Sequence, residues 1–204
     1  DGTYTFKPNP DVNGTITLKY VISDGASGNA LATTSFDIDA VNDKPIRTAG
    51  NVSTLYLQED QEITSLGLDG LDYSVGGGSD ESDAQTLSYT ITALPDTALG
   101  SVFLNDGITS ATEQQTLSLE ELQGLKFLPA LNAAGQVSFS FSVADSGSID
   151  GDGNIISAAV SISETVNINI LGFNDAPILP VDAIPLNDGS EDTAYNFTAE
   201  QLLA

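Results

Sequence analysis

The stretch DSGSIDGDGNIIS at 145–157 places oxygen-bearing side chains at alternate positions with glycines between them. Asp150, Asp152 and Asn154 have the spacing of the first three ligands of a calcium loop, because glycine lets the backbone curl around the ion. The glutamate that closes an EF-hand loop is missing, since residue 161 is a serine. The segment is therefore not an EF-hand. It is either half of a calcium site that other loops complete or a flexible polar hairpin.

The composition removes most enzyme chemistries. The 204 residues include no cysteine and no histidine, which excludes disulfides, thiolate and imidazole metal sites, and the usual catalytic triads. The absence of tryptophan, with only six tyrosines, leaves little platform for sugar rings beside a catalytic carboxylate pair. We expect the protein not to be an enzyme. The oxygen ligands that remain are those that hard cations such as Ca²⁺ prefer.

The net charge is −24, from 29 acidic and five basic residues. Repulsion on this scale destabilises a compact chain unless counter-ions gather, and Ca²⁺ is the expected one. So acidic a chain repels nucleic-acid phosphates and anionic lipids. Its apolar runs fall far short of the roughly twenty residues of a membrane span. We therefore expect no nucleic-acid partner and no membrane insertion.

Two short motifs recur 132 residues apart. VNDKPI at 41–46 returns as FNDAPI at 173–178, and QEDQ at 58–61 returns as SEDT at 190–193. Two independent motifs that share one offset indicate a tandem repeat.

A longer match has a smaller offset. FKPNPDVNGTITLKYVISDG at 6–25 aligns without gaps with FLPALNAAGQVSFSFSVADS at 127–146, an offset of 121 residues. The two offsets differ by eleven residues, so the middle repeat carries eleven extra residues after Asp145. The 145–157 stretch is that insertion.

The elements that must position these residues are strands. Apolar and polar residues alternate at 15–20, 138–141 and 166–170, which is typical of strands with one buried face. Clusters of Gly, Asn and Asp separate these runs as hairpin loops do. Only SLEELQGL at 118–125 predicts a helical turn. The expected fold class is all-β, with immunoglobulin-like or cadherin-like Greek-key β-sandwich repeats.

The repeat spacing predicts three pieces. Residues 1–44 are the C-terminal half of one repeat, 45–177 are a complete repeat with an enlarged loop between its last two strands, and 178–204 contain the first strand of a third repeat.

Several quoted motifs together resemble the cadherin-like tandem repeats of giant bacterial repeats-in-toxin (RTX) adhesins. They are GTYTFKPNPDVNGTITLKYVISDG, VNDKP, the ED pair, SDESDAQTLSYTI, SLEELQGLKFLP and SEDTAYNFTAEQLLA. The resemblance covers essentially the whole chain. It implies an extracellular protein on the bacterial surface, exported by type I secretion.

The resemblance also implies calcium ligands where one repeat meets the next. At the first junction they are Asn42, Asp43, Glu59, Asp60, Asp80, Asp83 and Asp145. At the second junction they are Asn174, Asp175, Glu191 and Asp192. The loop Asp80-Glu81-Ser82-Asp83 departs by one residue from the Asp-x-Asp spacing of the family, so Glu81 and Asp83 are alternatives. The plainer interpretations are a turn for the Asn-Asp-x-Pro linkers and a solvated acidic loop for SDESD.

Two functions follow as hypotheses. In the first, the middle repeat is a ligand-binding module of a calcium-dependent adhesin, and it recognises a protein, peptide or glycan on another cell through calcium in its long loop. In the second, it is a purely structural extender that calcium stiffens against the neighbouring repeats of the chain. The eleven-residue insertion favours the first, because binding sites are usually built on loops over a rigid scaffold.

Overall fold

The computed structural model describes residues 2–149, 155–176 and 188–198 of the chain. The predicted all-β class is confirmed: the described residues form mainly strands, with two short helices. The chain divides into two compact units, residues 1–172 and residues 173–204.

The first unit begins with a two-stranded antiparallel hairpin. β1 (Gly14–Ser23) pairs with β2 (Asn29–Ile38) along its whole length, and within the described residues neither strand pairs with a third. The rings of Phe6 and Phe36 meet edge to face, with centroids 5.6 Å apart.

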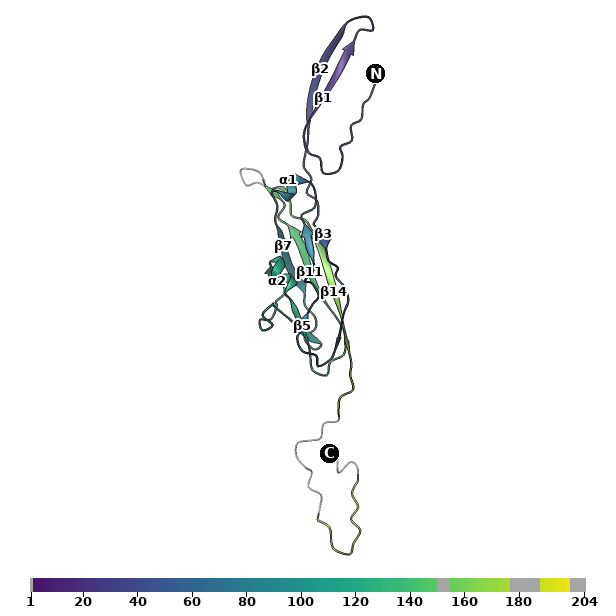
Figure 1. Cartoon of the computed structure of the whole chain (residues 1–204), viewed down its shortest axis with the longest axis vertical. Helices are drawn as coiled ribbons and strands as arrows, with labels where there is room; N and C mark the ends of the chain where they lie inside the picture. Colours follow the sequence, from purple (N-terminus) through teal and green to yellow (C-terminus); the bar gives the residue numbers. More distant parts are fainter. Residues whose placement is uncertain (1, 150–154, 177–187, 199–204) are drawn as a thin grey trace. The chain divides into compact units, whose positions relative to one another are not determined.

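A five-stranded sheet forms one layer of the sandwich that follows. Its order is β4 (Leu55–Gln58), β14 (Ser161–Leu171), β11 (Gly135–Asp145), β7 (Leu87–Ala93) and β9 (Thr116–Leu117). β4 runs parallel to β14, and the other neighbours are antiparallel. In Figure 1, β7, β11 and β14 lie side by side.

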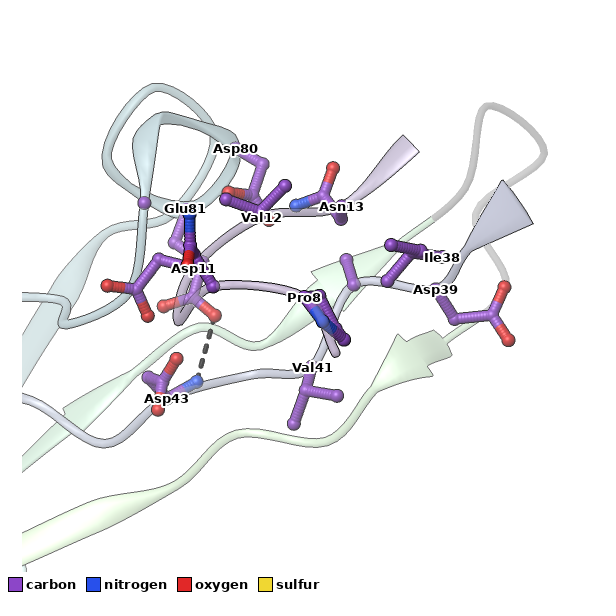
Figure 2. Close-up of a pocket in the computed structure, with 13 residues that line it drawn as sticks. Pro8, Asp11, Val12, Asn13, Ile38, Asp39, Val41, Asp43, Asp80 and Glu81 are labelled. Atoms are coloured by element: carbon purple, nitrogen blue, oxygen red, sulfur yellow. Dashed lines mark hydrogen bonds between the residues drawn. The ribbon is translucent and has the colours of Figure 1, made fainter. Parts of the chain in front are cut away.

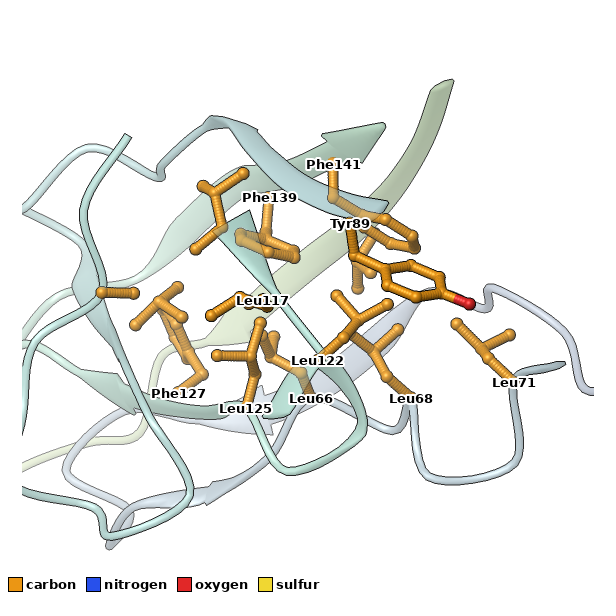
Figure 3. Close-up of a cluster of buried hydrophobic side chains, with 14 of the residues drawn as sticks. Leu66, Leu68, Leu71, Tyr89, Leu117, Leu122, Leu125, Phe127, Phe139 and Phe141 are labelled. Carbon is orange, nitrogen blue, oxygen red and sulfur yellow. The ribbon is translucent and has the colours of Figure 1, made fainter. Parts of the chain in front are cut away.

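Shorter strands form the remaining sheets of the sandwich. β5 (Thr64–Ser65), β10 (Lys126–Pro129) and β8 (Gly100–Phe103) make one sheet, and β3 (Ile46–Ala49) pairs with β6 (Asp72–Ser74). Figure 3 shows Phe127 of β10 in one buried cluster with Phe139 and Phe141 of β11. All three rings are 0 % exposed, so this cluster is the hydrophobic core that holds the layers together.

The two helices are short. α1 (Ser79–Ser82) follows a run of three glycines, and α2 (Leu119–Gln123) lies in the segment that the sequence predicts as a helical turn. A capping box begins α2: Glu121 N donates to Ser118 Oγ, and Ser118 N donates to Glu121 Oε2 at 2.7 Å. Leu122 fixes the helix against the core, where it is 0 % exposed.

The hairpin β11–β14 repeats the hairpin β1–β2. The starts of the paired strands differ by 121 and 132 residues, the two offsets found in the sequence. The additional residues between β11 and β14 include a small hairpin of β12 (Ser148–Ile149) and β13 (Ile155–Ser157). One contrast separates the repeats: Leu18 and Tyr20, which correspond to Phe139 and Phe141, are 41 % and 47 % exposed.

The second unit has no strand or helix among its described residues, 173–176 and 188–198. The first strand predicted within 178–204 therefore finds no support in residues 188–198, and the rest of that stretch lies outside the described residues. Within the unit, the rings of Tyr195 and Phe197 lie 6.3 Å apart.

Candidate metal centre

A glycine run shapes the loop before α1. Gly76 and Gly77 have φ angles of 93° and 47°, which glycine adopts without the steric cost that a side chain brings. A Cβ atom on Gly77 would overlap the Glu81 carboxylate, and one on Gly76 would overlap the carbonyl oxygen of Lys44. The glycines thus let Glu81 fold back onto its own loop and let the linker pass close by.

Glu81 is the buried acid of this region. Its side chain accepts a hydrogen bond at Oε1 from the backbone N–H of Asp43 at 2.8 Å, drawn as the dashed line in Figure 2. The residue is only 3 % exposed, and Oε2 has no hydrogen-bond partner. Burial, followed by the nearby charges of Asp43, Asp80 and Asp145, raises the pKa of Glu81 above its ordinary value, although the bond from Asp43 opposes the shift.

Asn42 connects the linker to the end of β11. Its Nδ2 donates to Asp145 Oδ1 at 3.0 Å and to the carbonyl oxygen of Ala158 at 3.0 Å. Its Oδ1 accepts from Nε2 of Gln85 at 2.6 Å. Gln85 is 7 % exposed, and its Oε1 has no hydrogen-bond partner. The linker is therefore held by side-chain amides, and a second buried oxygen is left unsatisfied beside it.

Asp145 anchors the turn after β11. Its Oδ1 accepts from Asn42 and from the backbone N–H groups of Gly147 and Val160, at 2.8 Å and 3.1 Å for the two backbone donors. Among the described residues, Oδ2 accepts a hydrogen bond only from the same Val160 N–H, at 3.2 Å. Oδ2 is thus the oxygen of Asp145 that keeps free lone pairs.

Five carboxylates surround one small cavity. The cavity has a volume of about 190 Å³, and Figure 2 shows acids from three segments around it. They are Asp11, Asp39, Asp43, Asp80 and Glu81. A second cavity of about 390 Å³ shares Asp80 and Glu81 and extends toward Ser146 and Ser148. Described Lys and Arg side chains line neither cavity.

The donor set suits a hard cation. Carboxylate and amide oxygens are the ligands that Ca²⁺ prefers, and the unpartnered Oε2 of Glu81 is a buried acceptor that lacks a donor. A buried acceptor of this kind is costly unless something satisfies it. Among the described residues, however, no three acidic side chains are grouped closely enough to hold a metal ion. The acids line one cavity without forming a closed shell of ligands.

The structure separates the two alternatives in the SDESD loop by position. Asp80 lies at both cavities, as the resemblance implies, but Asp83 is exposed and lines neither of them. Glu81, the alternative, lines both cavities. The reason is that the loop forms a helical turn, with Gln85 N donating to Glu81 O at 2.8 Å. Residues four apart on a helix share a face, so Glu81 and Gln85 are buried together.

Glu59 and Asp60 lie at the opposite end of the sheet from Asp145 and the acidic cavity around Glu81. Glu59 N donates to Leu171 O at the last residue of β14, whereas Asp145 ends β11 near the start of β14. Asp60 Oδ1 accepts from Asn132 N at 2.8 Å. The structure therefore does not bring the predicted set of seven ligands to one junction. The length of β14 separates Glu59 and Asp60 from Asp145.

The remaining predicted ligands fall elsewhere. Asn174 and Asp175 belong to the second unit, where Asn174 Nδ2 donates to the carbonyl oxygen of Asp175 at 3.2 Å. Asp192 has a left-handed φ of 62°, and Asp60, 132 residues earlier, has one of 58°. Glu191 precedes it in a turn. Asp150, Asp152 and Asn154 lie outside the described residues.

Sequence reasoning missed four residues of this region: Gln85, Asp11, Asp39 and, except as an alternative, Glu81. The sequence does contain one indication, since three consecutive glycines at 76–78 before an acidic run predict a close approach of backbone to another group. Nothing local indicates Asp11 or Asp39. They reach the cavity from the segments that flank the β1–β2 hairpin.

Comparison with protein-family models places part of the chain in a known family model. Residues 1–39, which contain the β1–β2 hairpin, match the family model of a cadherin-like domain. No curated protein matches the chain. Within the described residues, no helix has the length and apolar character needed to cross a membrane.

Proposed function

We propose that the chain is a calcium-binding, cadherin-like module of an extracellular adhesion protein, with a binding and structural role and no catalytic one. The observation that supports the proposal best is Glu81, a buried carboxylate whose Oε2 lacks any partner beside four other acids. The match of residues 1–39 to a cadherin-like domain is consistent with it. A bacterial surface protein of the RTX class, exported by type I secretion, is the setting that we propose from the sequence motifs.

In this proposal the acids around Glu81 bind the ion, and Asn42 positions the linker. Glu81, Asp43 and Asp80 would supply carboxylate oxygens to Ca²⁺, and Asp145 would supply Oδ2. Asn42 holds the linker against the end of β11 through the hydrogen bond from its Nδ2 to Asp145 Oδ1. The bound ion would turn the mutual repulsion of these acids into attraction and so fix the linker to the sandwich.

A calcium titration tests the proposal. We expect isothermal titration of the whole chain with CaCl₂ to give at least one saturable site, and Glu81→Gln to weaken it by about tenfold or more, since a ligand charge is lost without loss of packing. Glu120→Gln is the matched control, because Glu120 is an exposed acid on α2 that lines neither cavity. Equal titration curves for wild type and Glu81→Gln would refute the assignment.

A second candidate function is ligand recognition by the insertion. The cavity of about 390 Å³ is lined by Ser146, Gly147 and Ser148 on one side and by Glu81 on the other. We propose that a calcium ion there, held in part by Asp150, Asp152 and Asn154, presents an open position to a carboxylate of a peptide. In the alternative, the repeat is only a calcium-stiffened extender.

A loop deletion distinguishes these two. Replacing 147–154 by Asn-Gly keeps a hairpin, since that turn is favourable between antiparallel strands. We expect the variant to stay folded and to lose capture of peptides with a free C-terminal carboxylate, measured against the same peptides in amidated form. Equal capture by the variant and the parent, or no capture by either, supports the extender.

A further inference from the structure

The outer face of the five-stranded sheet carries no charged side chain at its outward positions. Along β14 these positions are Ser161, Ser163, Thr165, Asn167, Asn169 and Leu171. On the other strands they are Tyr56, Gln58, Gln136, Ser138, Ser140, Ser142, Ala144, Ser88, Thr90, Thr92 and Thr116. In a chain with 29 acids, an uncharged polar face of this extent is unexpected for a surface that serves only solubility.

A hollow on this face is lined mainly by hydroxyl and amide side chains, together with Val137 and Ile168. Its volume is about 280 Å³, and its lining includes Thr54, Tyr56, Gln136, Asn167 and Asn169. Tyr56 lies on β4, Asn167 and Asn169 lie on β14, and Gln136 lies on β11. Thr54 directly precedes β4. The hollow therefore crosses three neighbouring strands. It shares no lining residue with the acidic cavity around Glu81.

Strand register aligns the hollow's polar groups in a row. Asn169 pairs with Tyr56 of β4 on one side and with Gln136 of β11 on the other. Paired residues project to the same face of a sheet, so the phenol ring, one amide and a second amide follow one another across the strands. Asn167 lies two residues before Asn169 on the same face.

These side chains are available to a ligand. Tyr56 is 66 % exposed, and the side chains of Tyr56, Gln136, Asn167 and Asn169 make no hydrogen bond to another described residue. Elsewhere on this face, by contrast, Ser140 and Thr165 bond each other at 2.9 Å. An exposed ring beside free amides offers a stacking surface together with paired donors and acceptors.

We propose that this hollow binds a neutral carbohydrate, with Tyr56 stacked on a sugar ring and the amides of Gln136, Asn167 and Asn169 bonded to its hydroxyls. Each amide presents a donor and an acceptor together, which matches a pair of adjacent hydroxyl groups. The chain should not favour acidic sugars, because its net charge of −24 repels their carboxylate groups. This site is separate from the calcium centre and does not depend on it.

A titration followed by ¹⁵N-resolved NMR tests the proposal on the whole chain. The probes are neutral hexasaccharides of glucose, mannose and galactose, each added in CaCl₂ and again in EDTA. We expect at least one of them to shift the side-chain amide signals of Gln136, Asn167 and Asn169, equally in both buffers. Tyr56→Ala should weaken that binding about tenfold, the scale of one aromatic contact.

Two controls keep the test decisive. Thr92→Ala alters the same face on β7, away from the hollow, and Tyr4→Ala removes a tyrosine that is 96 % exposed; both should bind like wild type. The proposal is overturned if none of the sugars shifts these amides, if Tyr56→Ala binds as well as its controls, or if binding disappears in EDTA. None of these outcomes bears on the calcium titration of Glu81→Gln.

Discussion

Asn42 Nδ2 lies 3.0 Å from Asp145 Oδ1, although 103 residues separate the two in the chain. This contact joins the Asn-Asp linker to the end of β11, where the enlarged loop begins. Because the adjacent Asp43 N–H is bonded to Glu81, two consecutive linker residues are attached to two different loops. Directional hydrogen bonds thereby fix the linker at Asn42 and Asp43, two residues before the fully buried Pro45.

Asn42→Asp should loosen this attachment. The substitution keeps the shape of the side chain, but it removes the donor to Asp145 and places a second carboxylate beside it, which costs about 1–3 kcal/mol. We expect that loss in urea denaturation followed by circular dichroism in EDTA, with part of it recovered in CaCl₂. Asn51→Asp, at an exposed position, is the control. A loss equal to that of the control would show that the contact contributes nothing.

Calcium should stabilise the folded chain by mass action. A site at 100 times its Kd adds about 2.7 kcal/mol, which corresponds to a rise in Tm of roughly 5–10 °C for a chain of this size. Scanning calorimetry in CaCl₂ and in EDTA measures the shift, with MgCl₂ as the comparison because Mg²⁺ demands a tighter octahedral geometry. A Tm that is the same in all three buffers would contradict the calcium centre.

The buried Glu81 predicts opposite effects of one substitution in two buffers. Since folding raises the pKa of Glu81, the folded state holds that proton more tightly than the unfolded state, and ionisation at neutral pH destabilises the fold. In EDTA at pH 7, Glu81→Gln should therefore have a larger free energy of unfolding than wild type. In CaCl₂ the order should reverse, because the ionised side chain then has a cation.

The pH dependence supplies the check on that prediction. The advantage of Glu81→Gln in EDTA is complete above the raised pKa of folded Glu81, shrinks as the pH falls through it, and vanishes below the ordinary value of 4.5. Urea denaturation of both proteins at several pH values between 4 and 7 measures the difference. A constant difference across this range would mean that Glu81 does not titrate in the way its burial requires.

Equivalent positions of the two hairpins should differ in their effect on stability. Phe139→Ala removes a ring that is 0 % exposed and should destabilise the sandwich by about 3–5 kcal/mol. Leu18→Ala, at the corresponding position of the first hairpin, removes a side chain that is 41 % exposed and should cost about 1 kcal/mol or less. Urea midpoints from circular dichroism give both values. Comparable losses would show that the first hairpin is packed as firmly as the second.

Gly76→Ala tests the close approach of linker and loop. The added Cβ would meet the carbonyl oxygen of Lys44, and φ at this position is 93°, so we expect a loss of about 2 kcal/mol or more. Gly25→Ala is a matched control for the φ angle alone, since Gly25 has a φ of 80° and open space around it. If both substitutions cost the same, the contact with Lys44 has no effect of its own.

The sequence by itself determined the all-β class, the helical turn at 118–125 and the equivalence of the two hairpins. It did so because strand alternation, capping residues and repeat offsets are local properties that can be read along the chain. Four residues of the predicted calcium set, Asn42, Asp43, Asp80 and Asp145, lie around Glu81 and the linker. Their motifs lie in a linker and at strand ends, and strand ends at the same end of a sandwich lie close together.

The tertiary structure alone decided which acids share a cavity. Glu81 is buried and Asp83 is exposed because the SDESD loop forms a helical turn, which determines which side chains share a face. Glu59 and Asp60 separated from the cluster because β4 runs parallel to β14, so the end of β4 lies at the end of β14 and away from its start. The polar hollow at Tyr56 likewise depends on register between strands far apart in sequence, and no local pattern contains that register.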